Sequence, residues 1–279
     1  MYRLPLGQWV NYSVEWLLKH FGNAFDIFTA SVTTITDAIR DGVGLIPWFV
    51  IIFIFAMLAW RAKGWRLALG SVAGLGIIYN MELWLPFLDT LILVLIASFV
   101  ALFIGIPLGV LAARSERFHK ILSPVLDFMQ TMPSFVYLIP ALMFFNLGTV
   151  SAVFATVIFS MPPVIRLTDL GIRQVPIDLI EVGEAFGSSS SQMLWKIQLP
   201  LALPTIMAGI NQTMMLSLSM VVISAMIGAQ GLGAGVLAGI SQMDIGKGFE
   251  YGLAVVILAI ILDRLSQGVV CNSRGSAKK

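Results

Sequence analysis

The sequence predicts an all-α polytopic membrane protein, and three observations support that fold class. Of the 279 residues, 58% are apolar and only 11% are charged, whereas a soluble domain carries roughly 25% charged residues. The mean hydropathy is +0.92. Several apolar runs approach the roughly 20 residues that a helix needs to cross a bilayer. The chain therefore lacks the polar surface that would cover a water-soluble globule.

Residues 1–44 have the pattern of a helix that lies beside a membrane rather than across it. Apolar residues recur there at steps of three or four: Val10, Val14, Leu17, Phe21, Phe25, Phe28, Val32, Ile35 and Ile39. This spacing places them on one face of a long helix or helix pair. We expect an amphipathic extracytoplasmic or interfacial helix that lies along the outer membrane surface, packs against the protein's own bundle, or does both.

Seven membrane crossings are expected in the rest of the chain. They cover approximately residues 45–60, 67–82, 84–112, 131–147, 150–166, 204–228 and 250–269. The first two are accessory helices within 45–83, the other five form a core over 84–269, and a tail follows at 270–279. The third crossing contains Gly105 and Pro107, so we expect a tilt or kink there.

Lys and Arg are unevenly distributed between the two sets of loops. Thirteen of the 17 fall on the side that carries residues 167–203 and the C-terminus. The other four are Arg3, Lys19, Arg40 and Lys247. Loops rich in Lys and Arg stay in the cytoplasm. The sequence therefore predicts a cytoplasmic C-terminus and an N-terminus outside, which agrees with an odd number of crossings.

Residues 167–203 are the longest polar segment on the predicted cytoplasmic side. Pro176 suits the first position of a helix, and Gly187 suits a helix end in the left-handed conformation. The serines after Gly187 offer N-caps for a second short helix over 191–198. We therefore expect a helix, a glycine turn and a second helix just beneath the membrane. One face of the first helix would present Leu179, Val182 and Phe186.

The spacing in this loop resembles the EAA loop of bacterial ABC-importer permeases. That motif reads Glu-Ala-Ala, three residues, Gly, nine residues and Ile-x-Leu-Pro. The matching segment here comprises Glu181, Val182, Gly183, Glu184, Ala185, Gly187, Ile197, Leu199 and Pro200. Val182 and Gly183 stand where the motif has its two alanines. The resemblance implies that the loop docks this chain onto a separate ATPase, which would bind ATP and Mg²⁺, so that this chain has no catalytic residue and no cofactor.

Other segments resemble the glycine betaine and related osmoprotectant permeases over about residues 84–268. They are 129–140, 161–166, 171–176, 203–213, 220–223 and 231–233. The resemblance implies a type I ABC importer core and uptake of quaternary amines across the bacterial cytoplasmic membrane. It also implies partners: a second copy of the permease, two ATP-binding cassette subunits, an extracytoplasmic substrate-binding protein and membrane lipid.

Polar, aromatic and methionine residues in the predicted crossings are candidates for a weakly polar translocation path. They are Met132, Phe135, Tyr137, Asn211, Met214, Met215 and Ser217. Methionine and aromatic side chains can contact a trimethylammonium group, while Asn and Ser hydrogen-bond between membrane helices. Packing and structural hydrogen bonds explain the same residues, so both interpretations stay open.

Few charged residues lie close to the crossings. Asp89 is the one carboxylate that we place clearly inside a crossing, where a functional role and simple interfacial solvation are both open. Asp169 lies with Arg166 and Arg173 at the predicted cytoplasmic end of the fifth crossing, as interfacial anchors or gate-side ion pairs. His119 has no partner motif and is expected to be a solvated surface residue.

Two other function classes compete with an importer subunit. An ion-coupled secondary transporter of small zwitterions would carry internal repeats and midplane carboxylates, and we find neither in the sequence. A receptor or osmosensory scaffold would explain the N-terminal helix but not the loop spacing. An enzyme is not expected, because there is no Walker A motif, nucleophile constellation or metal-ligand spacing. A net charge of +2 without a long basic run gives no reason to expect nucleic acid.

Overall fold

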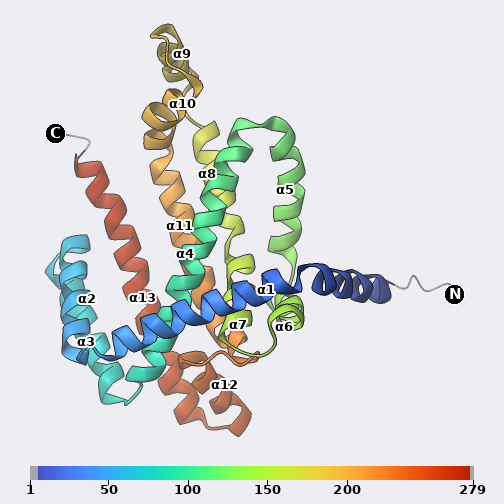
Figure 1. Ribbon diagram of the computed structural model, residues 1–279. Coiled ribbons are helices and arrows are strands. Elements are labelled where there is room, and N and C mark those ends of the chain that lie inside the picture. The colour runs from blue at the N-terminus through green and yellow to red at the C-terminus, as the bar shows by residue number, and fades with distance from the viewer. Residues whose placement is uncertain (1–5, 277–279) are drawn as a thin grey trace.

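The molecule is a bundle of long helices with a helical hairpin projecting from one end (Figure 1). The structure, a computed structural model, describes the backbone of residues 6–276 and the side chains of Trp9, Tyr12 and residues 14–268. Every regular element in this part of the chain is a helix. The all-α class predicted from composition is therefore confirmed.

Four helical stretches among the described residues are long and apolar enough to cross a membrane. They are α4 (Trp84–Arg114), α7 with α8 (Thr149–Ser160 and Pro162–Arg173), α10 with a π-helical turn and α11 (Ser190–Gln192, Met193–Gln198 and Leu199–Ala225), and most of α13 (Ile245–Ser276). Two further pairs of helices, each strongly bent, would raise the number to six if each pair is one crossing. Helix α4 continues unbroken through Pro107.

The chain enters the bundle through three peripheral helices. Helix α1 (Leu6–Gly44) crosses one face of the bundle and bends by 100° into α2 (Trp48–Lys63), which packs against α3 (Trp65–Asn80) (Figure 1). Helices α2 and α3 have 16 residues each and so extend over about 24 Å, less than the roughly 30 Å of a hydrocarbon core. The crossings expected at 45–60 and 67–82 are thus helical but short, and the count of seven stays a prediction.

Aromatic side chains attach α1 to the bundle. The ring of Phe25 stacks on Phe144 with centroids 4.8 Å apart, and the ring of Phe28 lies 5.3 Å from Phe145. Val32 is also buried. The predicted apolar stripe therefore packs against the protein itself at these positions. Three other members are exposed and available to a membrane surface: Phe21, Ile35 and Ile39. The side chain of Val10 lies outside the described part.

A helix that the sequence does not predict precedes the second core crossing. Helix α5 (Glu116–Thr131) follows α4 directly and contacts α4 and α8. After Thr131 the axis turns by 109° into a 3₁₀ turn (Ser134–Tyr137) and α6 (Leu138–Phe145). The predicted crossing over 131–147 covers the 3₁₀ turn and α6, and its bounds in a membrane stay a prediction. Charged residues in α5 kept that helix out of the predicted crossing. These residues are Glu116, Arg117, Lys120 and Asp127.

Helix α8 lies between α4 and α11, and glycines allow the close approach on both sides. A Cβ on Gly109 of α4 would lie 2.6 Å from the Thr168 Cβ, and a Cβ on Gly209 of α11 would lie 3.0 Å from the Leu167 Cβ. Gly105 of α4 and Gly171 of α8 sit in similar contacts. Small residues of this kind let membrane helices pack backbone against backbone. We call α4, α8 and α11 the glycine-packed core.

The C-terminal part closes the bundle at the end opposite the hairpin. Helix α12 (Leu232–Gln242) lies at that end and packs against α13 (Figure 1). Helix α13 then runs back toward the hairpin end as far as Ser276. It therefore includes most of the predicted tail at 270–279, of which the last three residues lie outside the described part.

Candidate functional site

The loop over 167–203 forms the helical hairpin that projects from the bundle (Figure 1). Its first arm is α9 (Ile177–Ala185), and its second arm is α10 with the π-helical turn, which continues into α11. Gly187 between the arms has a φ of +74°, a left-handed conformation that glycine adopts without steric cost. The predicted order of helix, glycine turn and helix is confirmed.

Local hydrogen bonds fix the turn between the two arms. The Ser188 amide donates to the Gly183 carbonyl over 3.0 Å. Ser189 forms a capping box with Gln192: its Oγ accepts from the Gln192 amide at 3.3 Å, and its own amide donates to Gln192 Oε1 at 2.9 Å. Pro176 is the N-cap of α9, one position before the place that the sequence predicts. The chain itself therefore sets the shape of the hairpin.

Gly183 lets the two arms meet. It is the one buried residue in α9, a helix that the structure describes throughout. A Cβ at this position would lie 2.7 Å from the Met193 Cε and 2.8 Å from the Ile197 Cδ1. Gly183, which stands where the motif has an alanine, thus allows the two arms to pack closely. Val182, at the other motif alanine, faces outward.

The outer surface of the hairpin combines exposed apolar side chains with carboxylates. We call the apolar residues the hairpin face: Ile177, Leu179, Val182, Phe186 and Trp195. Phe186 is 87% exposed, and Glu181 and Glu184 of the same arm are also exposed. The helical spacing predicts three of the five apolar residues but not Ile177 and Trp195. Several large apolar side chains exposed on one projecting hairpin are typical of a protein interaction site.

The remaining motif residues lie near the turn or where the hairpin joins the crossing helix. Ala185 is exposed at the end of α9, and Pro200 is exposed in the first turn of α11. Leu199 packs against a small buried cluster that links the second arm to α8 and α11. The cluster comprises Ile172, Leu194, Ala202 and Ile206. The hairpin is therefore attached directly to the glycine-packed core.

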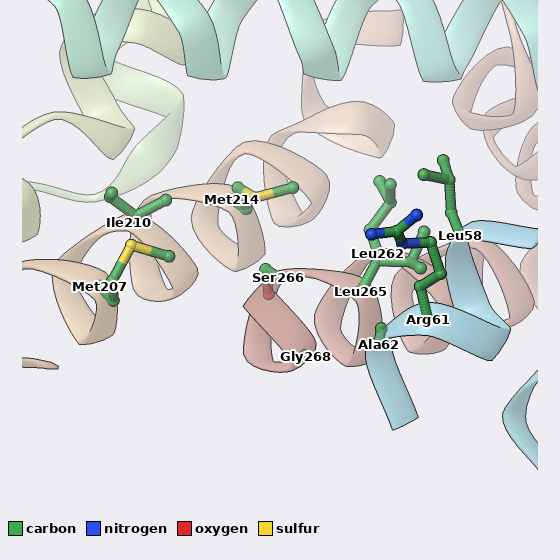
Figure 2. Close-up of a pocket in the computed structure, with 10 residues that line it drawn as sticks. All are labelled: Leu58, Arg61, Ala62, Met207, Ile210, Met214, Leu262, Leu265, Ser266 and Gly268. Carbon is green, nitrogen blue, oxygen red and sulfur yellow. The ribbon is translucent and has the colours of Figure 1, made fainter. Parts of the chain in front are cut away.

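Two of the candidate path residues lie on the side of α11 that faces α13. Met214 lines a cavity of about 510 Å³ together with Met207 and Ile210 (Figure 2). Asn211 is engaged next to it: its Nδ2 donates to Asp263 Oδ1 at 3.1 Å, and its Oδ1 accepts from Ser266 Oγ at 2.5 Å. Both residues therefore turn toward peripheral helices in this conformation.

The other path candidates are dispersed among buried and exposed positions. Tyr137 is buried and donates to the Met129 carbonyl. Ser217 is buried, accepts from Ser98 Oγ at 3.1 Å and donates to the Thr213 carbonyl at 3.0 Å. Met132 is partly buried against the main core. Phe135 and Met215 are exposed. A single chain therefore does not bring the seven residues together in one cavity among those found in its described part.

Three titratable side chains have partners that the sequence did not reveal. His119 is not an unpartnered surface residue, because its Nδ1 lies 2.7 Å from Asp169 Oδ2. Asp89 pairs with Arg40 of α1 at 2.9 Å. Asp263 is a second carboxylate within a crossing helix, which contradicts the prediction that Asp89 stands alone. Gln267, one turn later in α13, also donates to Asp263, so these contacts stabilise a charge that would be costly in a membrane.

Comparison with known proteins identifies the family. Residues 105–270 match the family described as binding-protein-dependent transport system inner membrane component. An inward-facing structure of the MetNI methionine ABC transporter has a chain that aligns with a TM-score of 0.62 at 21% identity, over 66% of this chain and 93% of that chain. At that identity the likeness shows the fold alone.

Relatives match over nearly the whole chain. The glycine betaine permease OpuAB of Bacillus subtilis is 48% identical, over 99% of this chain and 98% of its own length. The glycine betaine/carnitine permease GbuB of Listeria monocytogenes is 49% identical over 95% of both chains. The glycine betaine/proline betaine permease ProW of Escherichia coli is 47% identical, over 99% of this chain and 78% of its own length.

These relatives give no support to an ion-coupled secondary transporter. The partly buried carboxylate Asp263 removes one sequence argument against that class, but its contacts with Asn211 and Gln267 give it a structural role. The family match, the fold and the relatives agree with one another. The chain therefore belongs to the family of binding-protein-dependent transport system inner membrane components and is a multi-pass membrane permease subunit of an ABC transport system.

Proposed function

We propose that the chain is the permease subunit of an ATP-driven importer for glycine betaine or a related quaternary ammonium osmoprotectant. The observation that carries this proposal is the 48% identity to the OpuAB permease over nearly the full length of both chains. Relatives at similar identity are named for glycine betaine with carnitine or with proline betaine. A quaternary amine is therefore the shared substrate class.

The hairpin is the proposed docking site for a separate ATPase. Its exposed apolar face and carboxylates suit a groove on a cytoplasmic partner, which would bind ATP and Mg²⁺. Because the hairpin runs into α11 and follows α8 after residues 174–176, movement of the docked ATPase would pass into two core helices. The motif residues from Glu181 to Pro200 would hold the contact.

The proposed assembly contains two copies of this permease, two ATPase subunits and an extracytoplasmic substrate-binding protein, within the lipid of the bacterial cytoplasmic membrane. Seven crossings would place the N-terminus outside and the C-terminus in the cytoplasm. The excess of Lys and Arg supports this orientation, as does the position of the C-terminal end of α13 toward the same end as the hairpin (Figure 1). Helix α1 would then lie near the outer surface.

The translocation path would form between two copies of the chain. This arrangement accounts for path candidates that are exposed in a single chain, such as Phe135 and Met215. A weakly polar path fits a substrate that carries a permanent cation and a carboxylate, since affinity would reside in the binding protein. Asn211 and Met214 would contribute only after a movement away from α13.

Uptake by reconstituted vesicles tests the proposal. Proteoliposomes would hold this chain with its co-purifying partners, and radiolabelled glycine betaine would be added with its binding protein. We expect accumulation with ATP inside and none without it. Competition by unlabelled carnitine, choline and proline betaine would rank the substrates. Accumulation driven by a Na⁺ or H⁺ gradient in the absence of ATP would contradict the proposal.

A further inference from the structure

Helix α5 is attached to the rest of the chain mostly by polar contacts. Within α5, which the structure describes throughout, Leu126 is the one buried residue. Three apolar side chains on the helix are largely exposed: Ile121, Val125 and Phe128. Apolar packing within one chain therefore holds α5 weakly, in contrast to α8 in the glycine-packed core.

Three acid–base pairs connect α5 to α8. Glu116 pairs with Arg173, His119 Nδ1 lies 2.7 Å from Asp169 Oδ2, and Asp127 pairs with Arg166 at 2.6 Å. We call these pairs the α5–α8 seam. Positions 166, 169 and 173 share one face of α8, and positions 116, 119 and 127 share one face of α5. The order of the pairs is antiparallel, so the two helices meet along their length.

The seam is partly exposed. A cavity of about 140 Å³ lies between the two helices, lined by His119, Ser123, Arg166 and Asp169 among others. Four of the six paired side chains are between 35% and 67% exposed. Ion pairs that keep contact with water contribute little net stability. A contact of this kind can therefore open and close without a large energy cost, whereas a glycine-packed contact cannot.

Arg173 joins the seam to the hairpin. Its guanidinium pairs with Glu116 at the start of α5, donates through Nε to Asp169 Oδ1 at 2.7 Å, and donates through Nη2 to the Ala112 carbonyl at 2.8 Å. Residues 174–176 are all that separate it from α9. A displacement of the hairpin would therefore reach Arg173 before any other residue of the seam.

We propose that the α5–α8 seam opens and closes in each transport cycle, and that Arg173 is the positioning residue that carries movement of the hairpin to α5. This inference rests on the proposed ATP-driven function. Helix α5 leads into the 109° turn that carries the path candidates Met132 and Phe135. A shift of α5 relative to α8 would thus rearrange this part of the path while α4, α8 and α11 stay together.

Reversible cross-linking of the seam tests the proposal. In a Cys271→Ser background, Asp127→Cys and Arg166→Cys would be joined by a short, reducible bis-thiosulfonate in the assembled complex. We expect ATP-dependent uptake to fall roughly tenfold when the link forms and to return on reduction, because the cycle requires the two helices to part. Uptake by the linked protein at more than half the rate of its own reduced form would overturn the proposal.

A matched pair elsewhere controls for the reagent. Lys63 and Gln267 join the peripheral helices α2 and α13 at 2.8 Å, so Lys63→Cys with Gln267→Cys receives the same link outside the seam. We expect uptake by this pair to be unchanged by cross-linking. Loss of uptake in the seam pair alone supports the proposal that the seam opens during transport. Equal loss in both pairs overturns that proposal. Absence of ATP-dependent uptake in the unsubstituted protein would instead contradict the proposed function.

A second measurement does not require an active variant. The rate of cross-linking between positions 127 and 166 would be compared in the resting complex and after trapping with ATP and vanadate. We expect a change of at least severalfold between the two states, and equal rates would overturn the proposal.

The role of Arg173 is tested by substitution. For Arg173→Gln, we expect more ATP hydrolysed per substrate transported by the folded complex. Arg173→Lys should be only a partial rescue, because an ammonium cannot reproduce three directed guanidinium contacts. If Arg173→Gln hydrolysed as much ATP per substrate transported as the wild type, Arg173 would have no role in carrying movement from the hairpin to α5.

Discussion

The glycine-packed core and the hairpin end of the molecule are held together by different contacts. In the core, Gly109 and Gly209 bring α4 and α11 against α8 with no room for a larger side chain. At the hairpin end, Gly187 serves a turn and nothing lies within 4 Å of the place for its Cβ. The comparison teaches that changes in the core should reduce the amount of folded protein. Changes at the hairpin end should reduce transport by protein that is still folded.

The largest effect is expected in the core. Leu in place of Gly109 would place its Cβ 2.6 Å from the Thr168 Cβ and 2.7 Å from the Ile165 carbonyl oxygen, and the backbone cannot move away locally. Overpacking of this kind costs about 1–3 kcal/mol or more. We expect Gly109→Leu to lower the yield of folded, detergent-extracted permease severalfold in fluorescence-detected size exclusion.

The same substitution at Gly70 is the matched control. Gly70 lies in α3, and nothing lies within 4 Å of the place for its Cβ. We expect Gly70→Leu to fold at nearly the wild-type yield. Equal yields for the Gly70 and Gly109 variants would contradict the claim that close packing at Gly109 is needed for folding.

The next effect concerns the turn of the hairpin. Valine at position 187 would have to adopt a φ of +74°, which costs about 1–2 kcal/mol for a residue with a side chain and more for a β-branched one. We expect Gly187→Val to fold normally but to transport roughly tenfold less per complex. Gly187→Asn should keep most of the activity, since Asn tolerates this conformation. Full transport by the valine variant would count against the turn as a coupling element.

A smaller effect is expected where the two arms meet. Ala at position 183 would press on the Met193 Cε and Ile197 Cδ1 atoms, which are flexible ends of side chains and can shift. Leu would force the arms apart. We therefore expect Gly183→Leu to weaken co-purification of the ATPase severalfold, and Gly183→Ala to retain it. Identical retention by the two variants would show that the contact between the arms does not matter.

The smallest effect on stability is expected in the α5–α8 seam. Asp127 and Arg166 have exposed fractions of 63% and 41%, and an exposed pair contributes roughly 0–1 kcal/mol. We expect Asp127→Arg and Arg166→Asp each to leave the folded yield nearly unchanged while lowering transport severalfold. The double swap should restore at least about half of the activity, because the pair re-forms. If the double swap failed to restore activity and the amount of folded protein also fell, this pair would be needed for stability, as the core contacts are.

The features predicted correctly from the sequence are those set by local patterns. The hairpin was accessible because Pro176, Gly187 and the following serines are local signals for helix ends. The helical class was accessible because a bilayer forces the backbone to satisfy its own hydrogen bonds. Helix α5 was missed because its charged residues lower its hydropathy, although Glu116 and Asp127 pair with arginines of α8 in the fold.

Contacts between residues that are distant in the sequence could not be predicted in the same way. His119 and Asp169 are 50 positions apart, and Asn211 and Asp263 are 52 positions apart. Periodicity gives the face of a helix but not the neighbour that covers it. The seam and the Asp263 cluster therefore appear only when the helices are assembled. One signal was available for Asp263, because it falls inside the predicted crossing at 250–269.

The most direct test of the hairpin's role compares uptake and assembly in one variant. Glu181 is exposed on the hairpin, so Glu181→Lys reverses a charge on the proposed docking surface without disturbing packing. ATP-dependent glycine betaine uptake and the amount of folded permease would be measured in the same proteoliposomes. Our account predicts a normal amount of folded permease with uptake lost. Wild-type uptake by Glu181→Lys would contradict the central claim that the hairpin couples this chain to its ATPase.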